Sequence, residues 1–487
     1  MQQELHKTVS HLLTIGGDER IVPAHADGTN KYFSSPFPRA TVTYASSTAN
    51  DISQPAFDHL CQFVSDHEMT AEMAGADYAG HLSVLRDRIA AAYGLPQGTD
   101  IAFSASGTDL EYIALQAFSG RAVHGIHNVL LGADEVGSGC ILSAAGQYFA
   151  AQTAMGIPSS KGAVVPGLAS ISLSEVSVRN GFGEAFDSAV IVAAMRSEIE
   201  RALLAGKFPL LHVVHGSKTG LILPHLDDID ALITQYGDSI GFVVDACQAR
   251  ITSPAICAYL VRGAVVLMTG SKFMGGPPFS GFALVPRQLG ARISPLGEGM
   301  ATIFRRAELP EGWAGAERLP DSGNAGLTVR LAAALFELER FQALDFHTLA
   351  RVVEQFRCAS LALVDRIGGT RVTPYPFADR DQAGTHPIEM RTLTTVDLSG
   401  ERRAIDFDGA TAIQLKMMQS GVRLGQPVKC ARFQGLDMAG KVRGTLRIGI
   451  SMPQMVALAQ MEGEAEAQLD RDMAAIGDAF EAALASD

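Results

Sequence analysis

The sequence lacks the long apolar stretch and the export signal that membrane and secreted proteins carry. No apolar run reaches the roughly 18 residues that a bilayer-spanning helix requires. The first residues, MQQELHKTVSHLL, have no basic start followed by an apolar core and a small-residue cleavage site. We therefore expect a cytoplasmic protein that has no membrane partner.

Cysteine and clustered positive charge are also scarce. The six cysteines are scattered without a CxxC pair or histidines at zinc-site spacing, so neither a disulfide framework nor a metal site is expected. The net charge is −13 and no basic stripe is visible, whereas binding to nucleic acid requires one. We expect reduced thiols and no nucleic-acid partner.

What the sequence has instead is the composition of a large globular enzyme. It contains 487 residues, of which 47% are hydrophobic and 19% are charged. A chain of this length is too long to fold around one hydrophobic core of ordinary size, so we expect two or three domains with sizeable interiors. The same proportions exclude a largely disordered protein.

The pattern of apolar residues divides the chain into three parts. Residues 1–75 are rich in turn formers and predict an N-terminal arm that packs on something else, which in a dimer could be the other subunit. Residues 76–325 alternate short apolar runs with helical stretches and predict a large α/β domain. Residues 326–487 mix long helical patterns with strand-like segments and predict a smaller C-terminal α+β domain.

The large domain contains seven strand-like runs, namely IAFSAS, NVLLGAD, AVVPGLASIS, LLHVVHG, GFVVDA, AVVLMTG and SGFALVP. Such runs, apolar on both faces, are typical of a mostly parallel sheet that helices cover on both sides. The first helix is predicted from Leu82, Val84, Leu85 and Ile89, which recur at helical spacing before a stop at Gly94.

Four polar clusters directly follow these runs. They contain Ser106, Gly107 and Thr108; His215 and Ser217; Asp245 and Gln248; and Thr269, Ser271 and Lys272. Because ligands of open α/β sheets bind at the carboxyl ends of the strands, we expect the clusters to form one site. The first cluster stands at a predicted helix start, where backbone N–H groups bind phosphate, although the same residue types also cap ordinary helices.

Asp245 and Lys272 carry the chemistry of this site. A carboxylate at the end of an apolar strand is costly unless it caps a helix or faces a cation, and the ring nitrogen of pyridoxal 5'-phosphate (PLP) is such a cation. Lys272 follows the next strand, where partial burial would lower its pKa toward the free amine that attacks an aldehyde. Thr269 and Ser271 would add donors to the phosphate.

Taken in order, the clusters resemble the class V aminotransferase family of fold-type I PLP enzymes, which includes cysteine desulfurases. The resemblance covers roughly residues 80–455 and comprises an SGT loop, a turn like N/S-x-TG, a D-x-x-Q segment and S/T-x-x-K before a Gly-Pro-rich loop. It implies a large domain with a mainly parallel seven-stranded sheet, a smaller C-terminal α+β domain and a homodimer.

The resemblance also implies a role for each residue. Ser106, Gly107, Thr108 and Ser271 would hold the phosphate, Asp245 the ring nitrogen, Gln248 and Ser217 the ring oxygen, and Lys272 would form the Schiff base. VRLGQP and TLRIGIS look like the family's arginine segments, so Arg447 and Arg423 would bind a substrate carboxylate, unless either arginine is in a structural ion pair. His215 would offer a hydrogen bond beside the substrate, or HGSKTG is only a turn.

The chain departs from the family pattern at three places. Ser271 stands where the family often has histidine, and GADEVGSGC leaves only Val136 or Gly137 where a group often stacks on the ring. The reactive-cysteine loop of cysteine desulfurases is absent, since Cys430 comes later and lacks the paired histidines. Sulfur transfer through a persulfide is therefore disfavoured.

The reaction that we expect is transamination of an amino acid or similar amine. The residues leave elimination, decarboxylation and racemisation open, so a PLP-dependent lyase or decarboxylase is the alternative. A nucleotide-binding protein is disfavoured because neither G-x-x-x-x-G-K-[ST] nor GxGxxG is present. A regulatory PLP-fold protein would need a DNA-binding or partner-binding segment, which the arm does not resemble.

Overall fold

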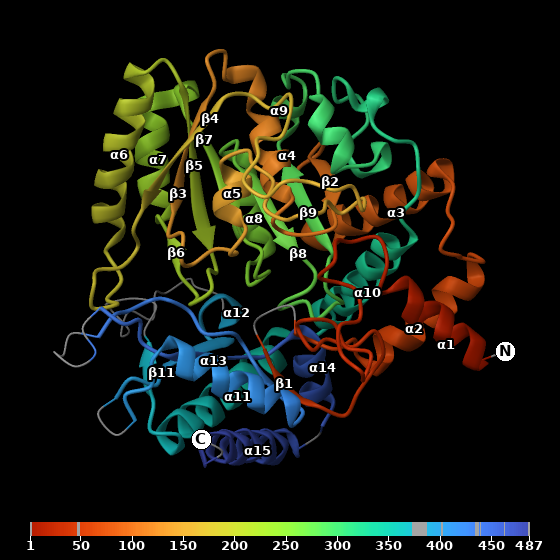
Figure 1. Cartoon of the computed structure of the whole chain (residues 1–487), viewed down its shortest axis with the longest axis vertical. Helices are drawn as coiled ribbons and strands as arrows, with labels where there is room; N and C mark the ends of the chain where they lie inside the picture. The colour runs from red at the N-terminus through yellow and green to blue at the C-terminus, as the bar shows by residue number, and fades with distance from the viewer. Residues whose placement is uncertain are drawn as a thin grey trace.

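A mainly parallel sheet forms the centre of the larger part of the protein (Figure 1). The computed structural model describes residues 2–45, 49–372, 387–400, 403–433, 438, 440–461 and 463–485. The strand order is β2-β9-β8-β7-β5-β3-β4, and the short β6 pairs with β5. The bounds are β2 Asp100–Ser104, β3 Ile126–Leu131, β4 Ile171–Val176, β5 Phe208–His215, β6 Ile222–Leu223, β7 Gly241–Asp245, β8 Val265–Thr269 and β9 Gly281–Val285.

Four neighbouring pairs of this order are parallel, and only β9 runs against both of its neighbours. The prediction of a mainly parallel seven-stranded sheet is therefore confirmed, with β6 added beside β5. Because β9 is antiparallel to both β8 and β2, the carboxyl ends of β2 and β8 point the same way. The strand ends that bear the predicted polar clusters thus lie at one edge of the sheet.

Helices and loops cover both faces of the sheet, because the strands are apolar on both sides. On one face, here named the α4 face, α4 (Leu110–Ala117) packs with Leu210 and Val243. The opposite face, named the α8 face, packs Leu211 and Val213 against a larger set of helices. That set includes α3 Gly75–Tyr93, α6 Ser188–Leu204, α7 Leu226–Tyr236 and α8 Ser253–Val261.

The first helix of this part forms largely as its sequence predicts. α3 ends where Gly94 adopts a left-handed conformation with φ of +57°. Leu82, Leu85 and Ile89 are buried, but Val84 is 58% exposed, because it lies on a different side of the helix from those three residues. The helical stop is confirmed, and the apolar stripe is narrower than predicted.

One predicted strand begins later than its sequence indicates. The run AVVPGLASIS covers residues 163–172, whereas β4 begins at Ile171. The earlier half turns at Gly167, which has φ of +79°, and a Cβ at this position would lie 2.6 Å from the Cα of Gly297. Left-handed backbone packed this closely against another loop suits glycine and excludes an extended strand.

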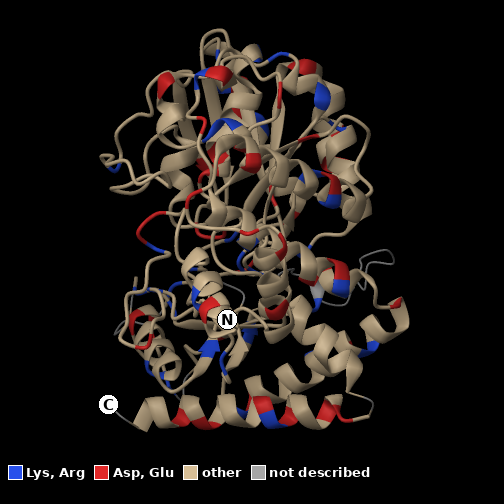
Figure 2. Cartoon of the chain, turned by 90° about the vertical axis from the view of Figure 1, so that its right-hand side faces the viewer, with Lys and Arg blue, Asp and Glu red and all other residues tan. Residues whose placement is uncertain are grey.

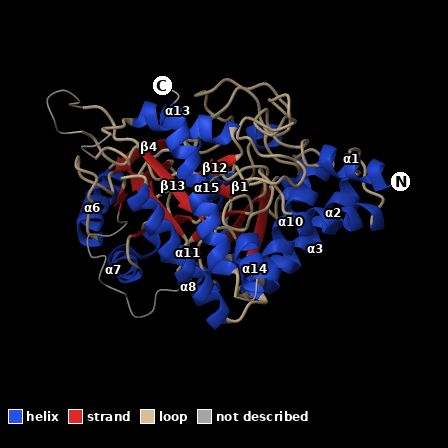
Figure 3. Ribbon diagram, turned by 90° about the horizontal axis from the view of Figure 1, so that it is seen from below, coloured by secondary structure: helices blue, strands red, loops and turns tan. Residues whose placement is uncertain are grey.

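The C-terminal part builds a small antiparallel sheet between helices, as Figures 1 and 3 show. Its order is β10-β11-β13, with β10 Thr370–Val372, β11 Leu393–Asp397 and β13 Thr445–Gly449. The helices are α10 Ala325–Gln342, α11 Phe346–Arg366, α12 Pro387–Met390, α13 Phe407–Gln419, α14 Met452–Gln460 and α15 Ala465–Ala485. α10 contacts α3 of the larger part and α14 of the smaller one, so it links them.

The N-terminal segment contains two helices that the sequence analysis did not anticipate. They are α1 Gln2–Leu12 and α2 Gln54–Asp66, and both pack against α10. α2 begins at Ser53, whose hydroxyl accepts a hydrogen bond from the N–H of Ala56 at 3.1 Å. Between these helices, β1 (Val42–Tyr44) pairs in parallel with β12 (Val422–Leu424). The segment therefore packs on both parts of its own chain.

Charged residues are distributed over both parts of the molecule. Figure 2 shows acidic and basic residues interspersed along most elements of this side. In the described ranges of the chain, no helix is both long and apolar enough to cross a bilayer.

Candidate functional site

The ends of β2, β7 and β8 meet at one edge of the sheet. A Cβ built on Gly107, just after β2, would lie 2.8 Å from Cγ2 of Thr269 and 3.1 Å from Sγ of Cys247. Thr269 ends β8, and its hydroxyl donates to the carbonyl of Cys247, just after β7, at 2.7 Å. The structure therefore brings three of the four predicted clusters into contact, and only glycine fits between them.

The loop after β2 presents unused backbone donors. In the described part of the chain, the N–H groups of Gly107 and Thr108 have no hydrogen-bond acceptor. The hydroxyl of Ser106 donates to Oδ2 of Asp109 at 2.6 Å and accepts from the N–H of Asp109 at 3.2 Å. Adjacent free N–H groups before a helix form a cradle for an anion, since they carry the positive end of the helix dipole.

Asp109 lies directly behind this cradle. It is 3% exposed, and burial raises the pKa of its carboxyl to about 7, although the hydrogen bond from Ser106 opposes the shift. The charge of the loop therefore changes near neutral pH, which matters for any anion bound beside it.

Asp245 ends β7 on the α4 face of the sheet. One of its oxygens, Oδ1, accepts a hydrogen bond from the N–H of Cys247 at 2.9 Å. His212 shares this face, because it pairs in register with Val243, two residues before Asp245. Burial lowers the pKa of His212, but the carboxylates of Glu111 and Asp245 outweigh burial and raise it. Nε2 of His212 lies 2.7 Å from Oε1 of Glu111.

The pKa values of two buried thiols, Cys140 and Cys247, are both influenced by Asp245 and by Lys272. Burial raises the pKa of Cys140 well above its usual value; Glu111 and Asp245 raise it further, and Lys272 and Lys218 lower it. Burial also raises the pKa of Cys247, with Asp245 raising it and Lys272 lowering it. The two residues on which the predicted chemistry depends are therefore electrostatic neighbours.

The loop that carries Lys272 is fixed on both sides of the lysine. The carbonyl of Lys272 accepts from Nδ2 of Asn50 at 3.0 Å, and the N–H of Phe273 donates to the carbonyl of Gln248 at 3.3 Å. The hydroxyl of Ser271 lies 3.5 Å from that of Thr269. The backbone around the amino group is thus held by the N-terminal segment and by the loop after β7.

The residues predicted beside the ring oxygen have protein partners. Oε1 of Gln248 accepts from Nη1 of Arg250 at 2.9 Å. The hydroxyl of Ser217 donates to Oε2 of Glu135 at 2.7 Å, and the hydroxyl of Thr219 donates to Oε1 at 2.9 Å. Ser217 therefore supports the loop after β3, in which the buried Glu135 lies.

The two predicted arginines of the C-terminal part have different surroundings. Arg423 lies on β12, where its Nη1 donates to Oδ1 of Asp51 at 2.5 Å in an ion pair with the N-terminal segment. Arg447 lies on β13, where Nε donates to the carbonyl of Gln426 at 2.8 Å and Nη1 to the carbonyl of Lys218 at 3.4 Å. Arg447 thus contacts the loop after β5, whereas Arg423 is paired with the N-terminal segment.

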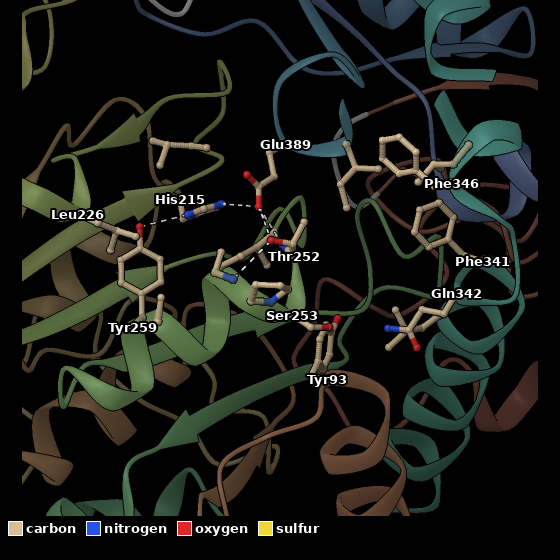
Figure 4. Close-up of a pocket in the computed structure, with 18 of the residues that line it drawn as sticks. Tyr93, His215, Leu226, Thr252, Ser253, Tyr259, Phe341, Gln342, Phe346 and Glu389 are labelled. Carbon is tan, nitrogen blue, oxygen red and sulfur yellow. Dashed lines mark hydrogen bonds and ion pairs between the residues drawn. The ribbon is translucent and has the colours of Figure 1, made fainter. Parts of the chain in front are cut away.

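The structure does not bring His215 to this group. His215 lies on the α8 face, where Nδ1 is 3.1 Å from the hydroxyl of Tyr259 and Nε2 is 3.5 Å from Oε1 of Glu389. Figure 4 shows these residues on the wall of a cavity of about 900 Å³, together with Tyr93 and Phe341. The described lining of this cavity contains neither Asp245 nor Lys272, so it is a separate space.

The sequence analysis assigned no role to Lys218 or Cys140, and in the loop after β3 it considered only Val136 and Gly137. Val136 is buried in the core, and a Cβ on Gly137 would lie 3.0 Å from Sγ of Cys140 and 3.9 Å from Oγ1 of Thr108. The loop after β3 thus lies beside the cradle, but the residues there, Val136 and Gly137, supply no aromatic ring that could stack on the cofactor. Lys218 stood inside the quoted HGSKTG turn, so its position after a buried strand was the available signal.

The residues at this edge fit PLP in three respects. The paired N–H groups suit its phosphate, Asp245 suits a protonated ring nitrogen, and Lys272 supplies a primary amine at the next strand end. The glycine cradle, which any larger residue would fill, leaves room for close approach to the backbone.

Comparisons with solved structures agree with this assignment of the fold. No protein-family model matches the chain, and no curated protein matches its sequence. Among solved structures, the cysteine desulfurase CsdA from Escherichia coli has a TM-score of 0.55 at 16% identity, covering 91% of this chain and 95% of that one.

Two further solved structures have the same architecture. A cysteine desulfurase from Thermococcus onnurineus has a TM-score of 0.53 at 14% identity, covering 88% of this chain and 93% of that chain. Pyridoxamine-pyruvate aminotransferase from Mesorhizobium loti has a TM-score of 0.50 at 18% identity, covering 92% and 98%. The chain therefore has the fold of the fold-type I PLP-dependent enzymes, as its resemblance to the class V aminotransferases predicted.

Proposed function

We propose that this chain is an enzyme that holds PLP covalently at Lys272 and acts on an amino acid or similar amine, with transamination as its reaction. The observation that carries the proposal is the shared environment of Asp245 and Lys272 beside the free N–H groups of Gly107 and Thr108. An acid, an amine and an anion cradle at one sheet edge are the groups that this cofactor needs.

Each side of the cofactor has a proposed partner. Ser106, Gly107, Thr108, Thr269 and Ser271 hold the phosphate through hydroxyl and backbone donors. Asp245 keeps the ring nitrogen protonated. Ser217 and Gln248 stay proposed contacts of the ring oxygen, Ser217 after a rotation away from Glu135. When bound, PLP withdraws electrons from the carbon that bears the substrate amine.

Lys272 would also act on the substrate. With a substrate amine bound, its amino group would accept or donate the proton at the substrate α-carbon. The loop contacts through Asn50 and Phe273 hold the backbone of Lys272, so only its side chain needs to move. Arg447 is the proposed partner of the substrate α-carboxylate, because it adjoins the site and its planar guanidinium suits bidentate capture.

The assignment of Lys272 is tested by trapping. The purified protein, incubated with PLP, is expected to absorb near the boundary of the visible and ultraviolet ranges, and borohydride should fix the cofactor to the peptide that contains Lys272. Lys207, which donates to the hydroxyl of Ser172 on the far strands, is the matched control and should stay unmodified. A colourless protein, or an adduct on any other lysine, would overturn the proposal.

A PLP-dependent lyase or decarboxylase is the second candidate, because cysteine desulfurases are among the matched structures. Analysis of the products after incubation with each amino acid and a keto-acid acceptor separates the two. Transamination gives an exchanged keto acid without CO2, sulfide or ammonia. A decarboxylase or a carbon-sulfur lyase releases one of these, and a carbon-carbon lyase of the retro-aldol type releases an aldehyde.

A further inference from the structure

A second amine, Lys218, lies in the turn after β5 where that turn meets the C-terminal part. Its carbonyl accepts from Nη1 of Arg447 at 3.4 Å, and its N–H donates to the carbonyl of Glu135 at 3.0 Å. Gly216 and Gly220, with φ of +74° and +93°, bend the chain on either side. The backbone of Lys218 is therefore fixed between the loop after β3 and the arginine that is proposed to bind substrate.

The ammonium group of Lys218 has no carboxylate partner in the described ranges. Its Nζ donates to the carbonyl of Asp134 at 3.2 Å, and no ion pair of Lys218 is present there. The neighbouring carboxylate, Glu135, is already bound by Nε of Arg179 at 3.0 Å and by the hydroxyls of Ser217 and Thr219. In the described ranges, the ammonium of Lys218 thus has a carbonyl as its partner and no direct contact with a carboxylate.

Lys218 faces other positive charges. Burial, the charge of Arg447 and, least of all, the charge of Lys272 lower the pKa of Lys218 to about 8, while Cys140 and Glu135 oppose the shift. Like charges around one site destabilise one another until an anion joins them. The phosphate of PLP would lie at the start of α4, beside the N–H groups of Gly107 and Thr108.

We propose that Lys218 and Arg447 form a two-cation subsite that selects substrates with a second acidic group. Arg447 takes the α-carboxylate and Lys218 takes a side-chain carboxylate, so the preferred substrates are acidic amino acids. This inference rests on the proposed function for the identity of the first carboxylate.

The test compares ligands that differ only in the second charge. L-aspartate is paired with L-asparagine, and L-glutamate with L-glutamine, and each is titrated calorimetrically into the PLP-loaded protein. In at least one pair, the acidic member should bind about tenfold more tightly, the value of one charge-assisted hydrogen bond. Lys218→Met should reduce the ratio to near one by weakening the acidic member, and Lys218→Arg should keep it.

Two further variants distinguish a specific contact of Lys218 from a general effect of positive charge on acidic ligands. Lys161→Met removes the same charge from an exposed position and should keep the preference. Arg447→Met should weaken both members of a pair, because both carry the α-carboxylate. Circular dichroism spectra verify that each variant is folded.

Three results would overturn the inference: equal binding of both members by the unmodified protein, a preference that survives Lys218→Met, or an equal weakening of both members in that variant. The last result would mean that both cations hold the same carboxylate. The titrations are repeated without PLP. If the protein takes up no PLP but still prefers the acidic ligands, the proposed function is wrong and the two-cation subsite is supported.

Discussion

The two faces of the large sheet carry similar polar residues at the same edge, yet they build different environments. His212 and His215 lie three residues apart on β5. His212 faces α4 and binds Glu111, on the side of Asp245, whereas His215 faces α8 and binds Tyr259 and Glu389. Among the residues that the structure describes, only the α4 face joins its polar residues to a lysine and an anion cradle.

This difference follows from the period of two along a strand. An odd spacing sends two side chains to opposite faces, and an even spacing keeps them on one. Each face has its own polar cluster, but on the α8 face the polar residues His215, Tyr259 and Glu389 contact one another. Four predictions test whether the functional division between the faces is as sharp as the geometry indicates.

The largest effect is expected from Lys272→Ala on the α4 face. Loss of the amine removes both the attachment point and the proton carrier, so activity should fall by at least about a thousandfold and the absorbance of bound PLP should change. Tyr259→Phe, on the α8 face, removes only the hydroxyl that contacts His215 and should change kcat/KM less than about threefold. Comparable losses in both variants would erase the distinction between the faces.

A smaller effect is expected from Asp245→Asn. An amide cannot hold the ring nitrogen in its protonated form, so kcat should drop about a hundredfold while the protein still takes up PLP. Steady-state kinetics and the absorbance spectrum measure the two quantities separately. Unchanged kcat would remove Asp245 from the proposed site.

The next prediction concerns how Asp109, behind the cradle, makes stability depend on pH. The unfolded chain releases this proton near pH 3.8 and the folded chain near 7, so stability is lost as pH rises between these values and then stays level. Asp109→Asn removes this loss. Relative to the unmodified protein, the free energy of unfolding of the variant should gain about 2–3 kcal/mol between pH 5 and pH 8.

Urea denaturation at pH 5 and pH 8 measures this gain. Ser106→Ala serves as a comparison, because it removes the hydrogen bond that favours the ionised carboxylate. In that variant the pKa of Asp109 should rise, so the loss of stability should extend to higher pH and be larger between pH 5 and pH 8. Parallel pH profiles for all three proteins would contradict the titration of Asp109.

The smallest effect is expected on the α8 face, from Glu389→Gln. Burial raises the pKa of Glu389, but hydrogen bonds and the charge of His215 outweigh burial and lower it, so the group is ionised at neutral pH. The amide weakens the contact with Nε2 of His215 and accepts more weakly from Thr252, which should cost about 1–2 kcal/mol of unfolding free energy. Thermal denaturation measures the loss, and kcat/KM should stay unchanged.

Much of the fold could be predicted because its signals are local. The parallel sheet follows from strands that are apolar on both faces, and the end of α3 follows from a glycine that adopts a left-handed conformation. The helix α2 was not predicted although its start has local signals. Ser53 and Pro55 mark that start, but the surrounding segment has weak periodicity. Roles for site residues such as Gln248 stay predictions.

The arginines show what sequence reasoning could not reach. Arg423 and Arg447 stand in comparable strand segments, and the sequence offered an ion pair or a substrate contact for each. Asp51, which binds Arg423, lies 372 residues away along the chain. No pattern near either arginine could have indicated this partner.

By itself, the sequence determined which residue types stand at the ends of buried strands, and hence that an acid, an amine and a glycine cradle share one sheet edge. Only the tertiary structure decided which face each side chain occupies, which arginine an aspartate neutralises, and that Lys218 stands beside Arg447. Strand patterning acts over a few residues, whereas these outcomes depend on contacts between segments that are distant in sequence and meet only after folding.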